Sequence, residues 1–242
     1  MEYTIYPLVL MRMEVPMYLM TYRMHVGETM WQPVMMFFIK GADKNILVDT
    51  GASAAGVRKY RDFVCEDVMS FEDALAKVNL SPEKIDIVIQ THLMFDHCES
   101  THKCINAKVI VQEEEMKYAF SPHPLQAHSY DREQFANLRL VPVRGDTKIM
   151  DGIEVLHTPG HSPGGQSVAI DTAKGKAIIT GFCCIGENFR PTEEQRKVLP
   201  VIPSAIAPNM YQWIDSALRI KGLADILLPI HEPEIGNMET IP

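Results

Sequence analysis

The sequence lacks three features that would assign it to common classes of protein. No apolar stretch approaches the length that a membrane-spanning helix needs. No basic run offsets the formal net charge of −8, which argues against nucleic-acid binding through phosphate contacts. The five cysteines are an odd number without the spacing of a secreted disulfide scaffold, which predicts reduced thiols. Because no basic region follows Met1, we expect no signal peptide and a cytoplasmic location.

The composition is that of an ordinary globular protein. A chain of 242 residues with 46% hydrophobic and 22% charged residues can bury a sizeable core. Runs of alternating apolar residues predict strands, and helical patterns follow Ser70 and Gln112 and cover 209–223. This interleaving predicts an α/β fold in which helices flank two sheets packed face to face. We find no internal repeat and predict one domain over residues 1–242.

Residues 89–99 have the pattern of a metal-binding loop. Alternating apolar residues lead into Thr91, and His92, Asp96 and His97 follow within six residues. Two imidazoles and a carboxylate at a strand end can converge on one divalent cation and suit Zn, Mn or Fe. Met94 lies among them, and its thioether is a poor ligand for such cations.

This loop and four other segments resemble the metallo-β-lactamase superfamily, in its branch of N-acyl homoserine lactonases. Residues 89–99 resemble the H-x-H-x-D-H signature with Met94 in place of one histidine. The other segments follow in the family's order; they are 46–51, 157–164, 179–182 and 229–232. The motifs span roughly residues 34 to 235. The resemblance implies the four-layer αββα sandwich of the metallo-β-lactamase fold.

The resemblance also implies positions for two metal ions. The family's first site corresponds to His92, Met94 and His161, and its second to Asp96, His97 and His231. The aspartate that bridges the two ions corresponds to Phe182. The substitutions at Met94 and Phe182 therefore affect the first site and the bridge, whereas the protein ligands of the second site are all present.

These departures favour a single ion. His92 and His161 alone are too few to hold zinc against water, and without the bridging carboxylate two close dications repel each other. We therefore predict one divalent metal ion at Asp96, His97 and His231, with zinc the first choice and manganese or iron as alternatives. His92 and His161 remain candidate ligands beside it.

Three neighbouring side chains leave alternatives open. The thiolate of Cys183 or Cys184 could replace the lost carboxylate, although adjacent cysteines at a strand end are more often buried apolar residues. Asp49 is predicted to accept a hydrogen bond from a ligand histidine.

A cation in this setting polarises a carbonyl and acidifies water, which predicts a hydrolase. The expected substrate is a small molecule with a lactone-like, cyclic amide, ester or thioester carbonyl. We predict catalytic roles for Asp96, His92 and His161, with the two histidines contacting the oxyanion or carrying a proton. The lactonase tyrosine that helps to hold the substrate corresponds to Ile185, which argues against acyl homoserine lactone itself.

Two other functions are compatible with the sequence. The chain could be a catalytically silent binding protein of the same fold, or a mononuclear iron enzyme with non-hydrolytic chemistry. Residues 11–33 and 120–137 are predicted to be irregular segments that cover the site or make subunit contacts, and we also consider a homodimer.

Overall fold

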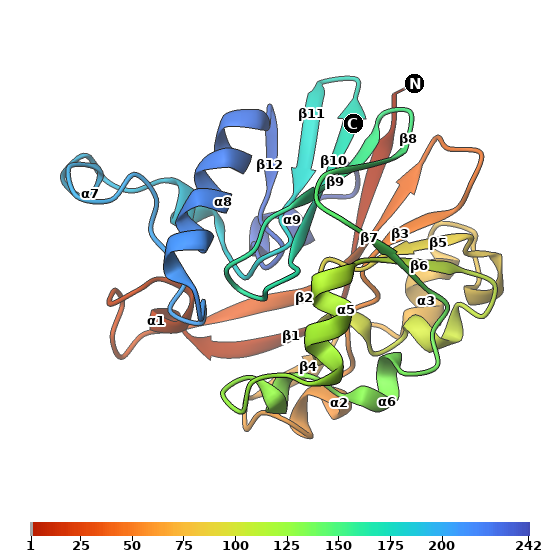
Figure 1. Cartoon of the computed structure of the whole chain (residues 1–242), viewed down its shortest axis with the longest axis horizontal. Coiled ribbons are helices and arrows are strands. Elements are labelled where there is room, and N and C mark those ends of the chain that lie inside the picture. Colours follow the sequence, from red (N-terminus) through yellow and green to blue (C-terminus); the bar gives the residue numbers. More distant parts are fainter. Residues whose placement is uncertain (1) are drawn as a thin grey trace.

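Two mixed β-sheets lie face to face in the computed structural model, which describes residues 2–242 (Figure 1). Within these residues the first sheet has seven strands, in the order β4-β1-β2-β3-β5-β6-β7. They are β1 (Thr4–Pro16), β2 (Thr29–Lys40), β3 (Ile46–Val48), β4 (Cys65–Asp67), β5 (Ile87–Ile89), β6 (Lys108–Gln112) and β7 (Leu140–Val143). The strands from β3 to β7 pair in parallel, and those from β4 to β3 pair antiparallel.

The second sheet has five strands among the described residues, in the order β12-β11-β10-β9-β8. They are β8 (Thr147–Met150), β9 (Ile153–His157), β10 (Gln166–Thr172), β11 (Gly175–Ile179) and β12 (Ile226–Leu228). Only the β11–β12 pair in this sheet is parallel. The chain ends meet at one edge of the molecule, because Ile5 and Ile241 exchange two backbone hydrogen bonds of 2.8 Å (Figure 1).

The helices are short apart from one. They are α1 (Met17–Met20), α2 (Ala54–Arg58), α3 (Phe71–Ala76), α4 (Phe95–Cys98), α5 (Glu113–Phe120), α6 (Arg132–Phe135), α7 (Glu193–Arg196), α8 (Met210–Leu223) and α9 (Pro233–Gly236). Short 3₁₀ turns cover Pro82–Lys84, Thr101–Lys103, Ala127–Ser129 and Gly186–Phe189. None of the helices in residues 2–242 is long and apolar enough to cross a membrane.

Apolar residues on both faces of the central strands create the layers. Val48 and Ile89 face the second sheet and pack in one core with Val155. Leu47 and Val88 point the other way and pack under α3. Strands that are buried on both faces read as continuous apolar runs, which explains the sequences of β3 and β5.

Helix α8 covers the outer face of the second sheet. Its side chains Trp213, Ala217 and Ile220 are buried against Ile178 and neighbouring residues. The Asn209 side chain caps its first turn by accepting a hydrogen bond from the backbone of Gln212. With α3 on the other side, the four-layer arrangement predicted from the sequence is confirmed.

The prediction of an irregular segment over residues 11–33 was wrong for residues 11–16 and 29–33, which belong to β1 and β2, whereas α1 and turns occupy the residues between them. Strand β1 continues to Pro16 and β2 begins at Thr29, and Val15 pairs with Met30 near the end of this long hairpin (Figure 1). Buried methionines alternate there with partly exposed charged residues, which is the period-2 pattern of a strand.

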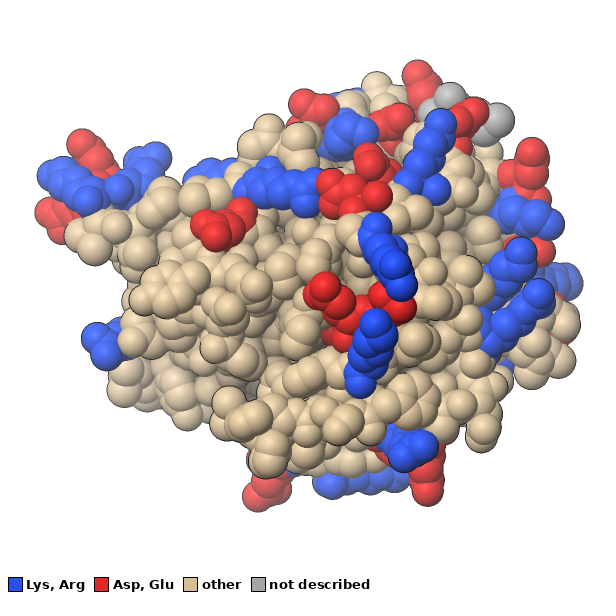
Figure 2. Space-filling view, viewed as in Figure 1, with Lys and Arg blue, Asp and Glu red and all other residues tan. Residues whose placement is uncertain are grey.

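Charged side chains are dispersed over the surface. Figure 2 shows acidic and basic residues interspersed on one face, where the described residues form no continuous basic tract. The mixed charges on that face therefore also disfavour binding to a phosphate backbone.

Candidate metal centre

The ends of strands from both sheets meet at one place. Asp49 follows β3, and Thr91 and His92 follow β5 in the first sheet. The loops after β9 and β12 in the second sheet carry His161 and His231. Ligand sites in sheets with parallel strands commonly form at the carboxyl ends of the strands. This convergence places five polar side chains, far apart in sequence, in one region.

Asp96, His97 and His231 form the tightest group there. One possible ligand atom from each residue lies within 4.8 Å of the other two, and this is the only such group among the residues that the structure describes. His97 Nε2 lies 3.4 Å from Asp96 Oδ2. Both rings are 2% exposed, whereas the Asp96 side chain is 13% exposed and reaches the cavity described below. The three predicted ligands of the single-ion site are thus brought together.

Hydrogen bonds fix which nitrogen each ring presents. His97 Nδ1 donates to Asp49 Oδ2 at 2.8 Å, and His231 Nδ1 donates to the Pro33 carbonyl at 3.0 Å. Asp49 also accepts bonds of 2.7 Å from the backbone N–H and the hydroxyl of Thr91. A proton on each Nδ1 leaves Nε2 free to bind a cation. The predicted supporting role of Asp49 is confirmed.

His92 and His161 extend the group without joining it. The His92 ring centroid lies 4.0 Å from that of His97 and 5.0 Å from that of His161. His161 Nδ1 donates to the Ile206 carbonyl at 3.1 Å, and His92 Nδ1 lies 2.9 Å from the Thr91 hydroxyl. His92 Nε2 is buried and has no hydrogen-bond partner among residues 2–242. A buried polar atom without a partner is costly, so its position suggests that a ligand or water belongs beside it.

Three of the four histidines in this region are neutral near pH 7. Burial lowers the pKa of His92 well below its usual value, and neighbouring imidazoles lower it further. Burial likewise lowers the pKa of His161 to about 4 and lowers that of His231. These three rings are therefore neutral near pH 7 and have lone pairs available for a cation.

Asp96 and His97 form a coupled pair. Burial opposes charge on both, but their mutual attraction outweighs it, so the pKa of Asp96 is lowered. The pKa of His97 is raised to about 10 for the same reason, with a contribution from Asp49. In the metal-free protein the proton on His97 Nε2 occupies a ligand position, so a cation must displace it.

Phe182 does not face this centre. Its ring packs 5.2 Å from Trp213 and 6.4 Å from Phe189, in the cluster under α8. The next residue, Cys183, lines the cavity and has its Sγ 3.7 Å from Met20 Sδ. Phe182, which corresponds to the bridging aspartate by the resemblance, therefore points away from the centre, and its neighbour Cys183 reaches the cavity instead.

The thiols of Cys183 and Cys184 face opposite sides: Cys183 faces the cavity and Cys184 faces α8. Cys184 Sγ lies 3.1 Å from the Thr180 hydroxyl and packs under α8, away from the cavity. Burial raises the pKa of Cys184 to about 12 and that of Cys183 well above its usual value. Of the two, only Cys183 is placed to contribute to the centre, and without a cation it is a neutral thiol.

Glu115 holds the two histidine loops together and was missed in the sequence. Its buried carboxylate accepts hydrogen bonds from Leu93 N at 2.9 Å, the Tyr130 hydroxyl at 3.0 Å and Gly164 N at 3.3 Å. A Cβ at Gly164 would lie 2.0 Å from Glu115 N, so only glycine allows this approach. Glu115 shares the buried face of α5 with Ala119, and an acid on a buried face was the available signal.

Replacing Glu115 by alanine is expected to lower the free energy of unfolding by about 3 to 5 kcal/mol, because several buried donors lose their acceptor. Urea denaturation measures this change. Glu114→Ala, at an exposed position on the same helix, is the control and should shift stability by less than about 0.5 kcal/mol. Equal shifts for the two variants would contradict the assigned role of Glu115.

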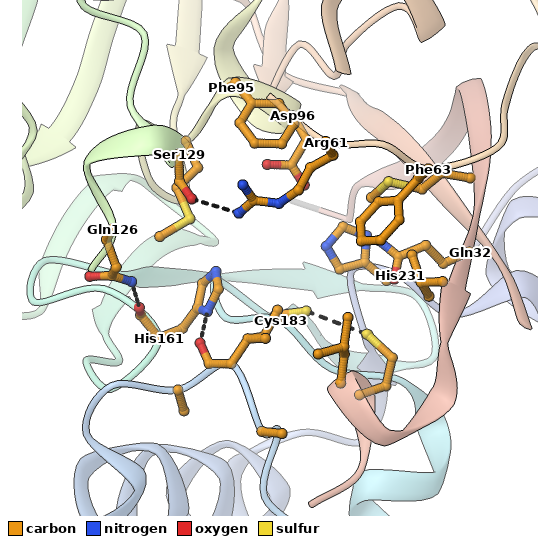
Figure 3. Close-up of a pocket in the computed structure, with 18 of the residues that line it drawn as sticks. Gln32, Arg61, Phe63, Phe95, Asp96, Gln126, Ser129, His161, Cys183 and His231 are labelled. Atoms are coloured by element: carbon orange, nitrogen blue, oxygen red, sulfur yellow. Dashed lines mark hydrogen bonds between the residues drawn. The ribbon is translucent and has the colours of Figure 1, made fainter. Parts of the chain in front are cut away.

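A cavity of about 370 Å³ opens onto the metal-binding group (Figure 3). Its lining is mainly apolar and comes from the hairpin, the 120s segment and the loop after residue 204. The residues are Met13, Val15, Leu19, Met20, Gln32, Arg61, Phe63, Met94, Phe95, Asp96, Leu125, Gln126, His128, Ser129, His161, Cys183, Ala205, Ile206, Ala207, Pro208 and His231. Both segments that were expected to cover the site contribute to it.

The comparisons with known proteins agree with this geometry. Residues 29–181 match the sequence model of the metallo-beta-lactamase superfamily, and the chain belongs to that superfamily. The family implies metal ions at this centre. Among curated proteins, the chain is 33% identical to an N-acyl homoserine lactonase of Bacillus sp over 165 residues, 63% of this chain and 64% of that relative. The lactonase AttM of Rhizobium radiobacter is 29% identical over 44% of each chain.

Solved structures extend the likeness over nearly the whole chain. The quorum-quenching N-acyl homoserine lactone hydrolase is 25% identical, with a TM-score of 0.79 over 98% of this chain and 96% of that one. A mutant of AiiA from B. thuringiensis with bound N-decanoyl-L-homoserine is 24% identical, with a TM-score of 0.80 and coverage of 97% and 95%. The predicted resemblance to the lactonase branch is confirmed.

Proposed function

We propose that this protein is a metal-dependent hydrolase that holds one divalent cation at Asp96, His97 and His231. The observation that carries the proposal is the group of a carboxylate and two oriented imidazoles, with atoms within 4.8 Å of one another, beside an apolar cavity. The substrate class is a small molecule with a lactone-like or cyclic amide carbonyl, or another ester or thioester.

The residues present fit a divalent cation. Each ring of the group has its Nδ1 engaged by an acceptor, so Nε2 is the nitrogen left for a cation, which on His97 takes the place of a proton, and Asp96 supplies a charged oxygen. Zinc, manganese and iron all accept this donor set. When bound, such a cation supplies Lewis-acid polarisation of a carbonyl and acidification of water.

The flanking histidines are oriented as proton acceptors. The N–H of His161 Nδ1 donates to the Ile206 carbonyl, which leaves a lone pair on Nε2 at the cavity. His92 is held similarly through Thr91, and its Nε2 is the buried atom without a partner. In these tautomers both rings can take a proton from water, whereas neither Nε2 can donate a hydrogen bond to an oxyanion. Proton transfer is therefore the better supported of the two predicted roles.

The relatives favour lactones within the carbonyl class. Curated relatives are N-acyl homoserine lactonases, and one solved relative holds the product N-hexanoyl-L-homoserine at its catalytic metal centre. Ile185, at the position predicted for the substrate-holding tyrosine, is buried and apolar. We therefore propose a lactone other than acyl homoserine lactone as the preferred substrate. The cytoplasmic location and the homodimer stay predictions.

Metal analysis tests the proposal directly. Protein purified without added metal should contain about one equivalent of Zn, Mn or Fe per chain, and chelation should lower its melting temperature, because a ligand of the native state stabilises that state. Release of protons from a panel of lactones should require the same ion. A metal-free protein with an unchanged melting temperature on metal addition would overturn the proposal, and two equivalents would overturn the single-ion centre.

A further inference from the structure

One positively charged side chain, Arg61, projects into the mainly apolar cavity. Arg61 lies in the segment after α2, and its half-buried side chain reaches the cavity between Asp96 and Ser129 (Figure 3). Its Nη2 donates to the Ser129 hydroxyl at 3.0 Å, and its Nη1 donates to the Tyr60 carbonyl at 3.1 Å. Its guanidinium also lies 5.6 Å from the centre of the Phe95 ring. These contacts hold the group in place and leave further N–H donors unused.

No carboxylate among residues 2–242 lies within ion-pair distance of Arg61. Burial lowers the pKa of Arg61, and the more distant charge of Asp96 partly restores it, so the group stays positive near pH 7. Asp96 itself is paired with His97 and belongs to the metal-binding group. A guanidinium that is partly removed from water and has no anionic partner is costly, and an anionic ligand would compensate this cost.

We propose that Arg61 is the specificity-determining residue of this cavity and binds a carboxylate of the substrate. The inference rests on the proposed function and specifies its substrate class: an ester or lactone that carries a carboxylate as well as an apolar portion. The planar guanidinium can bind a carboxylate through two hydrogen bonds, and Met13, Val15 and Leu19 offer apolar contacts to the remainder of the molecule.

Local charge makes this possible in an acidic protein. The net charge of −8 repels anions at a distance, but Arg61 and the cation expected beside Asp96 set the sign of the potential inside the cavity. A neutral substrate would leave Arg61 without a counter-charge, whereas a carboxylated substrate supplies one. We therefore expect the cavity to bind a carboxylated ligand more tightly than a neutral ligand of the same shape.

Binding of two non-reacting probes tests this preference. Octanoate and octanamide have the same length and differ in charge, and calorimetry on the metal-loaded protein measures their Kd values. Wild-type protein should bind octanoate at least about tenfold more tightly than octanamide. Arg61→Gln should raise the Kd for octanoate by about tenfold and change the Kd for octanamide by less than about twofold. Arg61→Lys should have an intermediate Kd for octanoate.

The control is Lys59→Gln, which removes the same charge from an exposed position two residues away and should behave as wild type. Any attraction between octanoate and the metal is common to all variants, so the difference between them reports on Arg61. If Arg61→Gln leaves octanoate affinity unchanged, or weakens both probes equally, the proposal is wrong. An equal loss would instead mean that Arg61 only supports the loop of Ser129.

The two proposals fail separately. If octanoate binding depends on Arg61 but no lactone or ester is hydrolysed, the carboxylate site stands and the hydrolase does not. If lactones are hydrolysed, and kcat/KM for a carboxylated lactone and its carboxamide analogue keeps the same ratio in Arg61→Gln, the Arg61 proposal fails and the hydrolase stands.

Discussion

Replacing Asp96 by asparagine is expected to remove the bound cation and to lower kcat/KM by at least about 10³-fold, or about 4 kcal/mol of transition-state stabilisation. The amide keeps the shape of the side chain but loses the negative charge that attracts a dication and is paired with His97. Metal content measured by mass spectrometry should fall to below about 0.1 per chain. Turnover of a reactive lactone measures the second effect.

The matched control is Asp151→Asn, which removes an exposed carboxylate that forms an ion pair with the exposed Lys148. Its metal content and turnover should equal those of wild type. Retention of one metal equivalent and near-normal turnover by Asp96→Asn would show that the centre lies elsewhere. A melting curve of each variant separates loss of the ion from loss of the fold.

The double variant Met94→His with Cys183→Asp is expected to bind a second metal equivalent. Met94, Cys183 and His161 all line the cavity. The new imidazole would join His92, whose Nε2 has no partner, and His161, while the new carboxylate would offset repulsion between two cations. The stoichiometry should therefore rise from about one to about two ions per chain.

Met94→His with Phe182→Asp is the discriminating comparison. The carboxylate at position 182 would be buried against Trp213 and Phe189, away from the cavity. We expect no second ion and a loss of about 4 kcal/mol or more in the free energy of unfolding. A second equivalent in this variant, and none with Cys183→Asp, would reverse the assignment of the two positions.

The directions of the side chains at positions 182 and 183 could not be predicted from the sequence. The family order of the motifs placed the strand end correctly, but the direction of each side chain depends on the last turn of the backbone after β11. There Phe182 packs against Trp213, about thirty residues further along the chain, and Cys183 is consequently turned to the cavity. A pattern that alternates with a period of two reverses its faces with a shift of one residue.

The metal-binding group itself could be predicted because its members lie in local motifs. His92, Asp96 and His97 share one loop, and the loop of His231 has its own signature. Arg61 has no such signature: its contacts with Ser129 and Phe95 join segments that only the fold brings together. The same holds for Glu115, whose partners Leu93 and Gly164 belong to other segments.

The lengths of the hairpin strands were underestimated for another reason. Methionine has no strong strand preference, so the alternation of Met11 and Met13 with Arg12 and Glu14 was interpreted as an irregular segment. Pairing with β2 stabilises the extended conformation and buries these methionines. Tertiary contact, rather than local propensity, decided the structure there.

The three Nδ1 tethers have a consequence for the molecule as a whole. The acceptors that hold His97, His161 and His231 are Asp49, Ile206 and Pro33, which belong to segments far apart in the chain. The orientation of each of these three rings therefore depends on a segment that is distant in sequence. Local opening of that segment would let the ring rotate and move its Nε2. Loss of the proposed ion would therefore report opening of the segment that carries Asp49 or Pro33, before the two sheets separate.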